Sequence, residues 1–251
     1  MPAVRDAIRH STVRARSGLE IIDLGSPIDV LWFRLSKLAG DPAQSLGNVR
    51  NGKFMVMIDR GDYWQCGYVI SKGAFDHRRR ERIETFRADV ADVAPFVGDR
   101  TDDVKTWDDV KLLSVAVDRL RRWYRPGLLC IGDSAHAMSP TGGVGINLAI
   151  QDAVAAANIL APALGRGAPD TGVLKMVQQR REFRTRVTQR VQIFMHDHFL
   201  APIFRNPGRA APPWPLRLVR RFARLRRIPA RLIGLGVRPE HVKTRDITRD
   251  K

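Results

Sequence analysis

The sequence predicts a mixed α/β fold, of the α+β kind, in which an antiparallel sheet precedes an α/β layer and a helical C-terminus. Two observations lead to this prediction. Three segments between residues 29 and 70 are rich in β-branched, aromatic and long apolar residues, which is typical of strands. Later in the chain, a continuous apolar segment at residues 128–131 precedes a glycine-rich loop and a helical pattern, as expected for a strand buried on both faces of an α/β layer.

The antiparallel sheet is built from strands at residues 29–35, 53–58 and 63–70. The short polar segment at residues 59–62 separates the last two and is typical of a hairpin turn. A further strand is expected at residues 109–115. The first 25 residues are mixed and show no clear periodicity.

Three helices are predicted from apolar residues that recur every three or four positions. The first covers residues 78–97, the second residues 146–160 and the third residues 174–199. The apolar positions of the first are Ile83, Phe86, Val90, Val93 and Phe96. The third is expected to place on or near one face Val177, Val187, Val191, Phe194 and His198. A proline-rich segment at 207–215 then leads into a basic amphipathic helix at 216–227.

The chain of 251 residues carries 43 Lys and Arg against 26 Asp and Glu, a net charge of +17. This surplus is compatible with a phosphate-bearing cofactor, nucleic acid or an anionic membrane surface. We expect no nucleic acid, because neither an RNP-like aromatic motif nor a reader helix is evident. No stretch of 18 or more apolar residues occurs, so we expect no membrane span. Cys66 and Cys130 match no CxxC or zinc spacing and are expected to be reduced thiols of a cytoplasmic protein.

The most informative segment is residues 127–153. A buried strand ends at Gly132-Asp133, which would place a carboxylate at the sheet edge where α/β folds bind ligands and ribose-like hydroxyls. Glycines then allow the backbone to approach a ligand closely. The helix that follows would direct its free N–H groups and positive dipole end at the same ligand. The residues of this candidate site are Gly132, Asp133, Pro140, Gly142, Gly143, Gly145, Ile146 and Asn147.

Residues 132–136, with sequence GDSAH, together with Pro140 and the GGVGIN of residues 142–147, resemble the second FAD fingerprint of the flavoprotein monooxygenases of the para-hydroxybenzoate hydroxylase type. The resemblance implies that Asp133 holds the ribityl chain of FAD and that residues 140–147 lie along the isoalloxazine. It also implies that the dipole of the helix beginning near Ile146 stabilises negative charge on the flavin. An ordinary strand-to-helix connection is the alternative.

Two further features bear on the resemblance. Residues 9–14, with sequence RHSTVR, resemble the end of the family's Asp-Gly motif, but Ala7-Ile8 stand where the family has Asp-Gly; a solvated basic N-terminus is the alternative. The GxGxxG fingerprint that opens the family's chains and binds the FAD pyrophosphate does not occur. We therefore expect the C-terminal part of a family member, whose missing segment is lost, encoded upstream of Met1 or supplied by a separate chain.

The resemblance implies an incomplete three-layer FAD-binding domain joined to an antiparallel-sheet substrate domain. The expected regions are 1–25 (a remnant of the Asp-Gly region), 26–120 (substrate sheet), 121–200 (later FAD-binding part) and 201–251 (helical tail). A complete relative would use NAD(P)H and O2 to hydroxylate a small aromatic or polycyclic substrate. No catalytic residue is assigned. The alternative is a non-catalytic remnant or partner protein that retains the fold.

Other candidates are disfavoured on chemical grounds. Ser134 and His136 suggest a hydrolase, but Ser134 lies outside a GxSxG elbow. His196 and His198 are two apart on a predicted helix and point to different sides, so solvated or capping histidines are expected rather than metal ligands. Trp32, Tyr63 and Trp64 could line a substrate pocket, although such strand aromatics are more often core. The basic helix 216–227 is expected to pack on the protein, with anionic lipid contact as the alternative.

Overall fold

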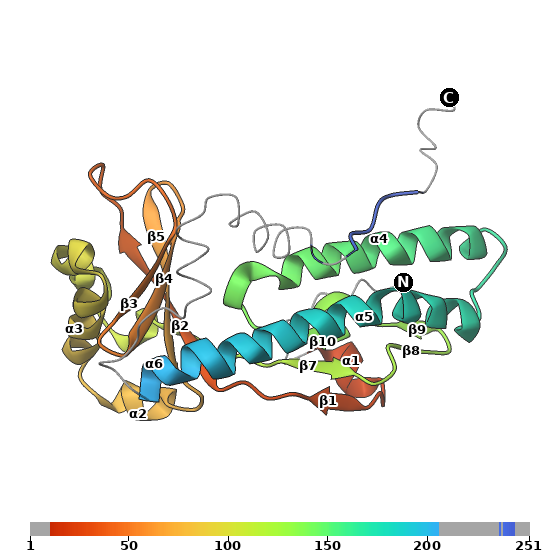
Figure 1. The fold of residues 1–251 in the computed structure, drawn as a ribbon, viewed down its shortest axis with the longest axis horizontal. Helices are drawn as coiled ribbons and strands as arrows, with labels where there is room; N and C mark the ends of the chain where they lie inside the picture. Colours follow the sequence, from red (N-terminus) through yellow and green to blue (C-terminus); the bar gives the residue numbers. More distant parts are fainter. Residues whose placement is uncertain (1–10, 206–235, 237, 244–251) are drawn as a thin grey trace. The chain divides into compact units, whose positions relative to one another are not determined.

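The computed structural model describes residues 11–205, 236 and 238–243. The chain divides into two compact units, a sheet unit and a helix unit (Figure 1). The sheet unit comprises residues 26–115 and 193–214, and the helix unit comprises residues 1–25, 116–192 and 215–251. The basic segment 216–227 and the proline-rich segment 207–215 lie outside the described residues.

The sheet unit is organised around a five-stranded antiparallel sheet, as the sequence predicts. Its strand order is β3-β4-β5-β2-β6. The strands are β2 (Ile28–Ser36), β3 (Leu46–Arg50), β4 (Lys53–Asp59), β5 (Tyr63–Ser71) and β6 (Lys111–Leu113). The hairpin turn between β4 and β5 is confirmed, since Asp59 pairs with Trp64 across it. Strand β3 was not predicted, and β6 is shorter than expected.

One face of this sheet forms the main hydrophobic core. Side chains that alternate along β2 and β4, such as Leu31, Phe33 and Met55, are at most 3% exposed. They pack against Phe86 and Val90 of helix α3 (Ile83–Val93). This alternation is the two-residue period of a strand with one buried face. Trp64 is fully buried in this core, whereas Trp32 and Tyr63 are half-buried.

The single helix expected at residues 78–97 is two helices instead. Helix α2 (Phe75–Arg80) ends where Glu81 adopts an extended backbone, and α3 begins after Arg82, which is also extended. A 3-10 segment, Pro95–Asp103, follows α3 because Pro95 cannot continue its hydrogen-bond ladder. A second 3-10 turn, Trp107–Asp109, precedes β6.

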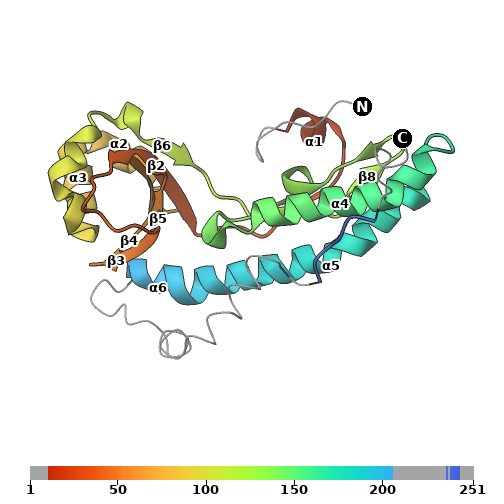
Figure 2. The same ribbon diagram turned by 90° about the horizontal axis from the view of Figure 1, so that it is seen from above.

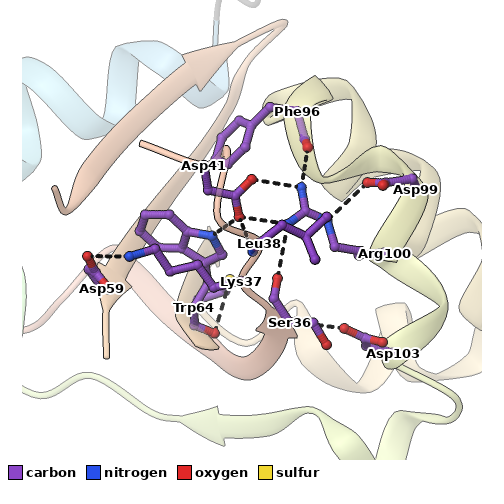
Figure 3. Close-up of polar contacts among 11 residues, drawn as sticks. Ser36, Lys37, Leu38, Asp41, Asp59, Trp64, Phe96, Asp99, Arg100 and Asp103 are labelled. Atoms are coloured by element: carbon purple, nitrogen blue, oxygen red, sulfur yellow. Dashed lines mark hydrogen bonds and ion pairs between the residues drawn. The ribbon is translucent and has the colours of Figure 1, made fainter. Parts of the chain in front are cut away.

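A partly buried ion pair attaches the Pro95–Asp103 segment to the loop after β2 (Figure 3). Both Nη atoms of Arg100 donate to the Asp41 carboxylate, at 2.6 and 3.0 Å. The indole Nε1 of Trp64 and the backbone N–H of Leu38 donate to the same carboxylate. The Arg100 guanidinium holds the pKa of Asp41 well below its usual range, against the opposing effect of burial and with help from Trp64. This cluster closes one end of the sheet-unit core.

The helix unit contains short antiparallel strands and two long helices. Its elements are α1 (Thr12–Arg16), β1 (Ile21–Asp23), β7 (Asp118–Leu120), β8 (Tyr124–Arg125), β9 (Leu128–Leu129), β10 (His136–Ala137), α4 (Gly145–Leu164) and α5 (Thr171–Met195). Strand β7 lies between β1 and β10, and β8 pairs with β9. Figure 2 shows the long helices α4 and α5 side by side. A π-turn, His196–Leu200, and helix α6, Ala201–Arg205, continue the chain into the sheet unit.

The segment at residues 128–131 is not the doubly buried strand that its composition predicts. Only Leu128 and Leu129 form a strand, which pairs with β8 in a hairpin, and both side chains are half-buried. Cys130 is fully buried, but it belongs to a small cluster with Leu120 and Trp123. A run of apolar residues does not by itself distinguish a central strand from a hairpin that packs on one side.

The buried face of α5 agrees with the expectation at Val177, which is fully buried, but differs from it further along the helix. Val191 and Phe194 are 40% and 54% exposed, whereas Gln178, Gln189 and Gln192 are buried. Each of these glutamines bonds with the main chain of residues 118–139: Gln189 Nε2 donates to the carbonyl of Asp118, at 2.7 Å. The glutamines of α5 therefore supply hydrogen bonds to main-chain groups of β7, β10 and the segments next to them, which need partners when they are buried.

Arg14, for which a solvated N-terminus was the alternative, and His196, expected as a solvated or capping histidine, are both buried. Arg14 is 5% exposed and its Nη2 donates to Asp118 Oδ1, at 2.7 Å; Ser11 caps α1 by accepting from the Arg14 N–H. His196 is 1% exposed, and burial lowers its pKa. His198 is exposed, and its ring stacks on Phe194.

Within the described part of the chain, α4 is long and apolar enough to cross a membrane by length and composition. Asp152 nevertheless lies in its middle, fully buried and paired with His136 and Arg181. The face of α4 that carries Asp152 therefore packs on the helix unit, since a buried charge is satisfied there by partners of the same fold.

Candidate functional site

The loop between β9 and β10 packs directly on helix α4. Gly132 has a φ of +57°, and a Cβ added there would lie 2.9 Å from the Cβ of Ala149. The position therefore requires glycine both for its left-handed backbone and for close approach to the helix. The Gly132 N–H donates to Asp152 Oδ2, at 3.0 Å, so the loop is also hydrogen-bonded to α4.

Asp133 is a half-buried carboxylate that accepts no hydrogen bond from the described residues. Burial raises its pKa, and the nearby His136 has a smaller opposing effect. Its Oδ1 would lie 3.9 Å from a Cβ added at Gly145, the first residue of α4. The structure thus brings Asp133 to the N-terminus of the helix, with acceptor capacity that the described residues do not use.

Gly142 and Gly143, which lie between Pro140 and α4, are exposed. Gly142 and Gly143 have φ angles of +83° and +64°, and no atom lies within 4 Å of a Cβ added at Gly143. The N-cap of α4 makes no side-chain hydrogen bond, so this helix N-terminus has no side-chain cap for its first N–H groups. Ile146 is 69% exposed on that turn, and Asn147 is half-buried next to it.

A buried network of charged side chains connects the Gly132 loop to helices α4 and α5. Asp152 Oδ2 lies 2.6 Å from His136 Nε2, and Asp152 Oδ1 accepts from Arg181 Nε of α5, at 2.7 Å. All three side chains are at most 1% exposed. Although burial raises the pKa of Asp152, the hydrogen bonds and charges of His136 and Arg181 lower it overall. Asp152 therefore connects the Gly132 loop, β10 and both long helices.

The sequence did not identify Asp152, Arg181 or the glutamines of α5 as parts of the site. Gln192 exchanges two hydrogen bonds with the main chain of Ser139, at 2.9 and 3.1 Å, immediately before Pro140. One signal was available: Asp152 is the sole charged residue in the apolar sequence of α4. Such an isolated charge on a buried helix face indicates a partner elsewhere in the chain.

The hydrogen bonds of Ser134 and His136 argue against the hydrolase alternative. Ser134 Oγ donates to the carbonyl of Ile131, at 2.8 Å, while His136 Nε2 bonds with Asp152. A serine nucleophile needs an adjacent base that can take its proton, and the hydrogen bonds of both side chains are directed elsewhere.

Comparison with known proteins identifies related sequences. A family model described as "FAD binding domain" matches residues 9–191. The 6-methylpretetramide 4-monooxygenase of Streptomyces rimosus is 34% identical over 188 residues, which cover 74% of this chain and 44% of the relative. An FAD-dependent monooxygenase of Aspergillus flavus is 35% identical over 88 residues, covering 34% of this chain and 18% of the relative.

Solved structures show the same fold. The OxyS anhydrotetracycline hydroxylase of Streptomyces rimosus superposes with a TM-score of 0.62 and 21% identity, covering 94% of this chain and 46% of the hydroxylase. CabE, an aromatic hydroxylase from angucycline biosynthesis, gives a TM-score of 0.58 and 19% identity, over 92% of this chain and 46% of CabE. The chain thus spans less than half the length of these relatives.

Proposed function

Because this chain belongs to the FAD binding domain family, we propose that its helix unit binds FAD through residues 132–147. The observation that supports this most directly is Asp133, a half-buried carboxylate at the uncapped start of α4 that accepts no hydrogen bond within the part of the chain that the structure describes. The flavin half of FAD offers ribityl hydroxyls, a flat ring and a pyrimidine edge that becomes negative on reduction. The three features of the site match these three parts.

Each part of the site has a distinct role in the proposed complex. Asp133 accepts hydrogen bonds from ribityl hydroxyls, and these bonds offset the free-energy cost of burying its carboxylate. Gly142 and Gly143 let the main chain lie against the ring, since no Cβ intervenes. The first turn of α4, with Gly145, Ile146 and Asn147, places its dipole next to negative charge on the flavin.

We further propose a monooxygenase reaction on a small aromatic or polycyclic substrate, with NAD(P)H and O2, in the cytoplasm. When bound, FAD supplies the electron transfer and oxygen chemistry. The chain's residues orient the flavin and shield it from water, and residues 26–120 would supply substrate contacts from the sheet. The relatives that support this proposal are named as a 6-methylpretetramide 4-monooxygenase and an aromatic hydroxylase. None of them points to a second chain that completes the site.

The test is a titration of the purified chain with FAD, followed by visible absorbance and flavin fluorescence. Wild-type protein is expected to give a resolved, shifted flavin spectrum. Asp133→Asn removes the carboxylate charge while preserving its shape and is expected to weaken FAD binding by about tenfold, since charge-assisted hydrogen bonds contribute about 1.5–3 kcal/mol each. The matched control is Glu20→Gln, which neutralises a carboxylate that is 63% exposed in the same unit.

The outcomes separate the two hypotheses about function. Binding by wild type and the Glu20 variant, with loss in the Asp133 variant, would support a flavin site, and NAD(P)H oxidation assays would follow. A folded wild-type chain that leaves the FAD spectrum unchanged would contradict the proposal and favour a non-catalytic protein that retains the fold.

A further inference from the structure

A short C-terminal segment, residues 238–243, binds across both long helices of the helix unit and is called here the C-terminal strap (Figure 1, dark blue). On α4, the side chain of Asn158 donates to the carbonyl of His241 and accepts from the N–H of Lys243, both at 2.8 Å. On α5, Arg184 Nε donates to the carbonyl of Arg238, at 2.6 Å. The strap is therefore fixed through its main chain at both ends.

The centre of the strap is a buried acid among arginines. The side chain of Glu240 is 4% exposed and lies 2.9 Å from Arg180 Nε and 3.1 Å from Arg184 Nη1. Its Oε1 also lies 3.6 Å from Nη1 of the fully buried Arg181. Removing one partner from a buried ion pair leaves an uncompensated charge, so Glu240 has a larger effect than an exposed surface acid would have.

Arg181 connects Glu240 to the candidate flavin loop. Its Nε donates to Asp152 Oδ1, at 2.7 Å, and Asp152 Oδ2 in turn accepts from the N–H of Gly132, at 3.0 Å. Nη2 of Arg181 is buried and has no hydrogen-bond partner among the described residues. The guanidinium is oriented by Asp152 at Nε and by Gln151 and Glu240 at Nη1. A continuous series of buried polar contacts thus extends from the strap to the residue that precedes Asp133.

We propose that the C-terminal strap positions the flavin-binding loop, and that Glu240 is the positioning residue. Glu240 holds Arg181 in the orientation that directs Nε at Asp152, and Asp152 holds the Gly132 loop against α4. The dependence of FAD affinity on the strap rests on the proposed function. The positioning of the loop does not, because all of its contacts are made by the protein alone.

The experiment uses the full 251-residue chain with Glu240→Gln, which removes the charge and preserves the shape. Glu182→Gln is the matched control, since Glu182 lies on α5 but contacts Gln178 and Arg186 rather than Arg181. The first measurement is hydrogen exchange of the Gly132 amide without FAD. The internal reference is the Cys130 amide, which donates to the carbonyl of Trp123 in the same unit. The second measurement is the dissociation constant for FAD.

Glu240→Gln is expected to speed exchange at Gly132 by about tenfold relative to Cys130, equal to about 1.4 kcal/mol. The dissociation constant for FAD is expected to rise by a similar factor, whereas Glu182→Gln changes neither. In a double-mutant cycle, Asp152→Asn and Glu240→Gln are expected to be non-additive in FAD affinity, because they interrupt the same series of contacts.

The inference would be overturned if Glu240→Gln accelerated amide exchange equally at Gly132 and Cys130. It would also be overturned if the variant lowered the melting temperature but left the exchange at Gly132 relative to Cys130 unchanged. Either result would show that the strap only stabilises the helix pair. Additive effects on FAD affinity would overturn it as well. A wild-type chain that does not bind FAD would contradict the proposed function, while exchange at Gly132 would still decide whether the strap positions the loop.

Discussion

Replacing Gly132 with alanine tests whether the loop packs on α4 as closely as the structure shows. At φ +57°, an alanine is strained by about 1–2 kcal/mol. Its Cβ would lie 2.9 Å from the Cβ of Ala149, and overpacking of this kind costs about 1–3 kcal/mol. The lower entropy of the unfolded alanine chain offsets about 0.4–1 kcal/mol. The variant is therefore expected to lose about 3 kcal/mol of unfolding free energy.

The control is Gly127→Ala in the same unit. Gly127 has a similar φ of +73°, but no atom lies within 4 Å of an added Cβ, so only the strain and entropy effects apply. This variant is expected to lose about 1 kcal/mol. The difference of about 2 kcal/mol between the variants isolates the contact with Ala149. Both are measured by urea unfolding of the full chain, followed by circular dichroism.

A rescue experiment makes the reasoning refutable. Adding Ala149→Gly to Gly132→Ala removes the clash of about 2 kcal/mol but introduces a glycine into α4, which costs about 1 kcal/mol. The double variant should therefore be about 1 kcal/mol more stable than Gly132→Ala. Equal losses in Gly132→Ala and Gly127→Ala, or further destabilisation by Ala149→Gly, would refute the close packing of the loop on the helix.

Three further predictions concern the buried polar groups. Asp152→Asn is expected to destabilise the chain by about 3 kcal/mol in the same assay, because Arg181 loses the nearer of its two buried acidic partners; a loss below about 1 kcal/mol would contradict this. The pKa of Asp41 is lowered chiefly by Arg100 from its ordinary 3.8, so its stabilising contribution is complete well above pH 4 and is lost as the pH falls below 4. The stability gap between wild type and Asp41→Asn should accordingly shrink between pH 5 and pH 2, and a constant gap would oppose the assignment. Burial raises the pKa of Cys66 to about 12, so it should not react with a disulfide reagent at pH 8 until denaturant is added, and rapid labelling of the native protein would disprove its burial.

Features set by near neighbours in the sequence could be predicted. The two-residue alternation of β2 and β4, and the hairpin turn between β4 and β5, follow from local apolar patterning and turn chemistry. The glycine-rich loop and the start of α4 were also placed correctly, because glycine and the following helical pattern are local signals. The break between α2 and α3 was missed, since no proline or glycine marks it.

Only the tertiary structure decided which polar groups are buried and what they contact. The partners of Asp152 lie 16 and 29 residues away in the chain, and Gln189 bonds with backbone 71 residues away. A side chain's polarity predicts exposure unless a distant group satisfies its hydrogen bonds, and a single sequence does not record that pairing.

The same division holds for the site. The sequence by itself determined a carboxylate, a glycine-rich turn and a helix start in consecutive order, because these depend on backbone conformation at adjacent residues. That Asp133 has no hydrogen-bond donor among the described residues, and that Glu240 joins the series of buried contacts from Arg181 to Gly132, follows from how residues 132 and 152, 152 and 181, and 181 and 240 meet in the folded chain. Burial in a low-dielectric interior gives these contacts their strength, and burial is a property of the folded chain.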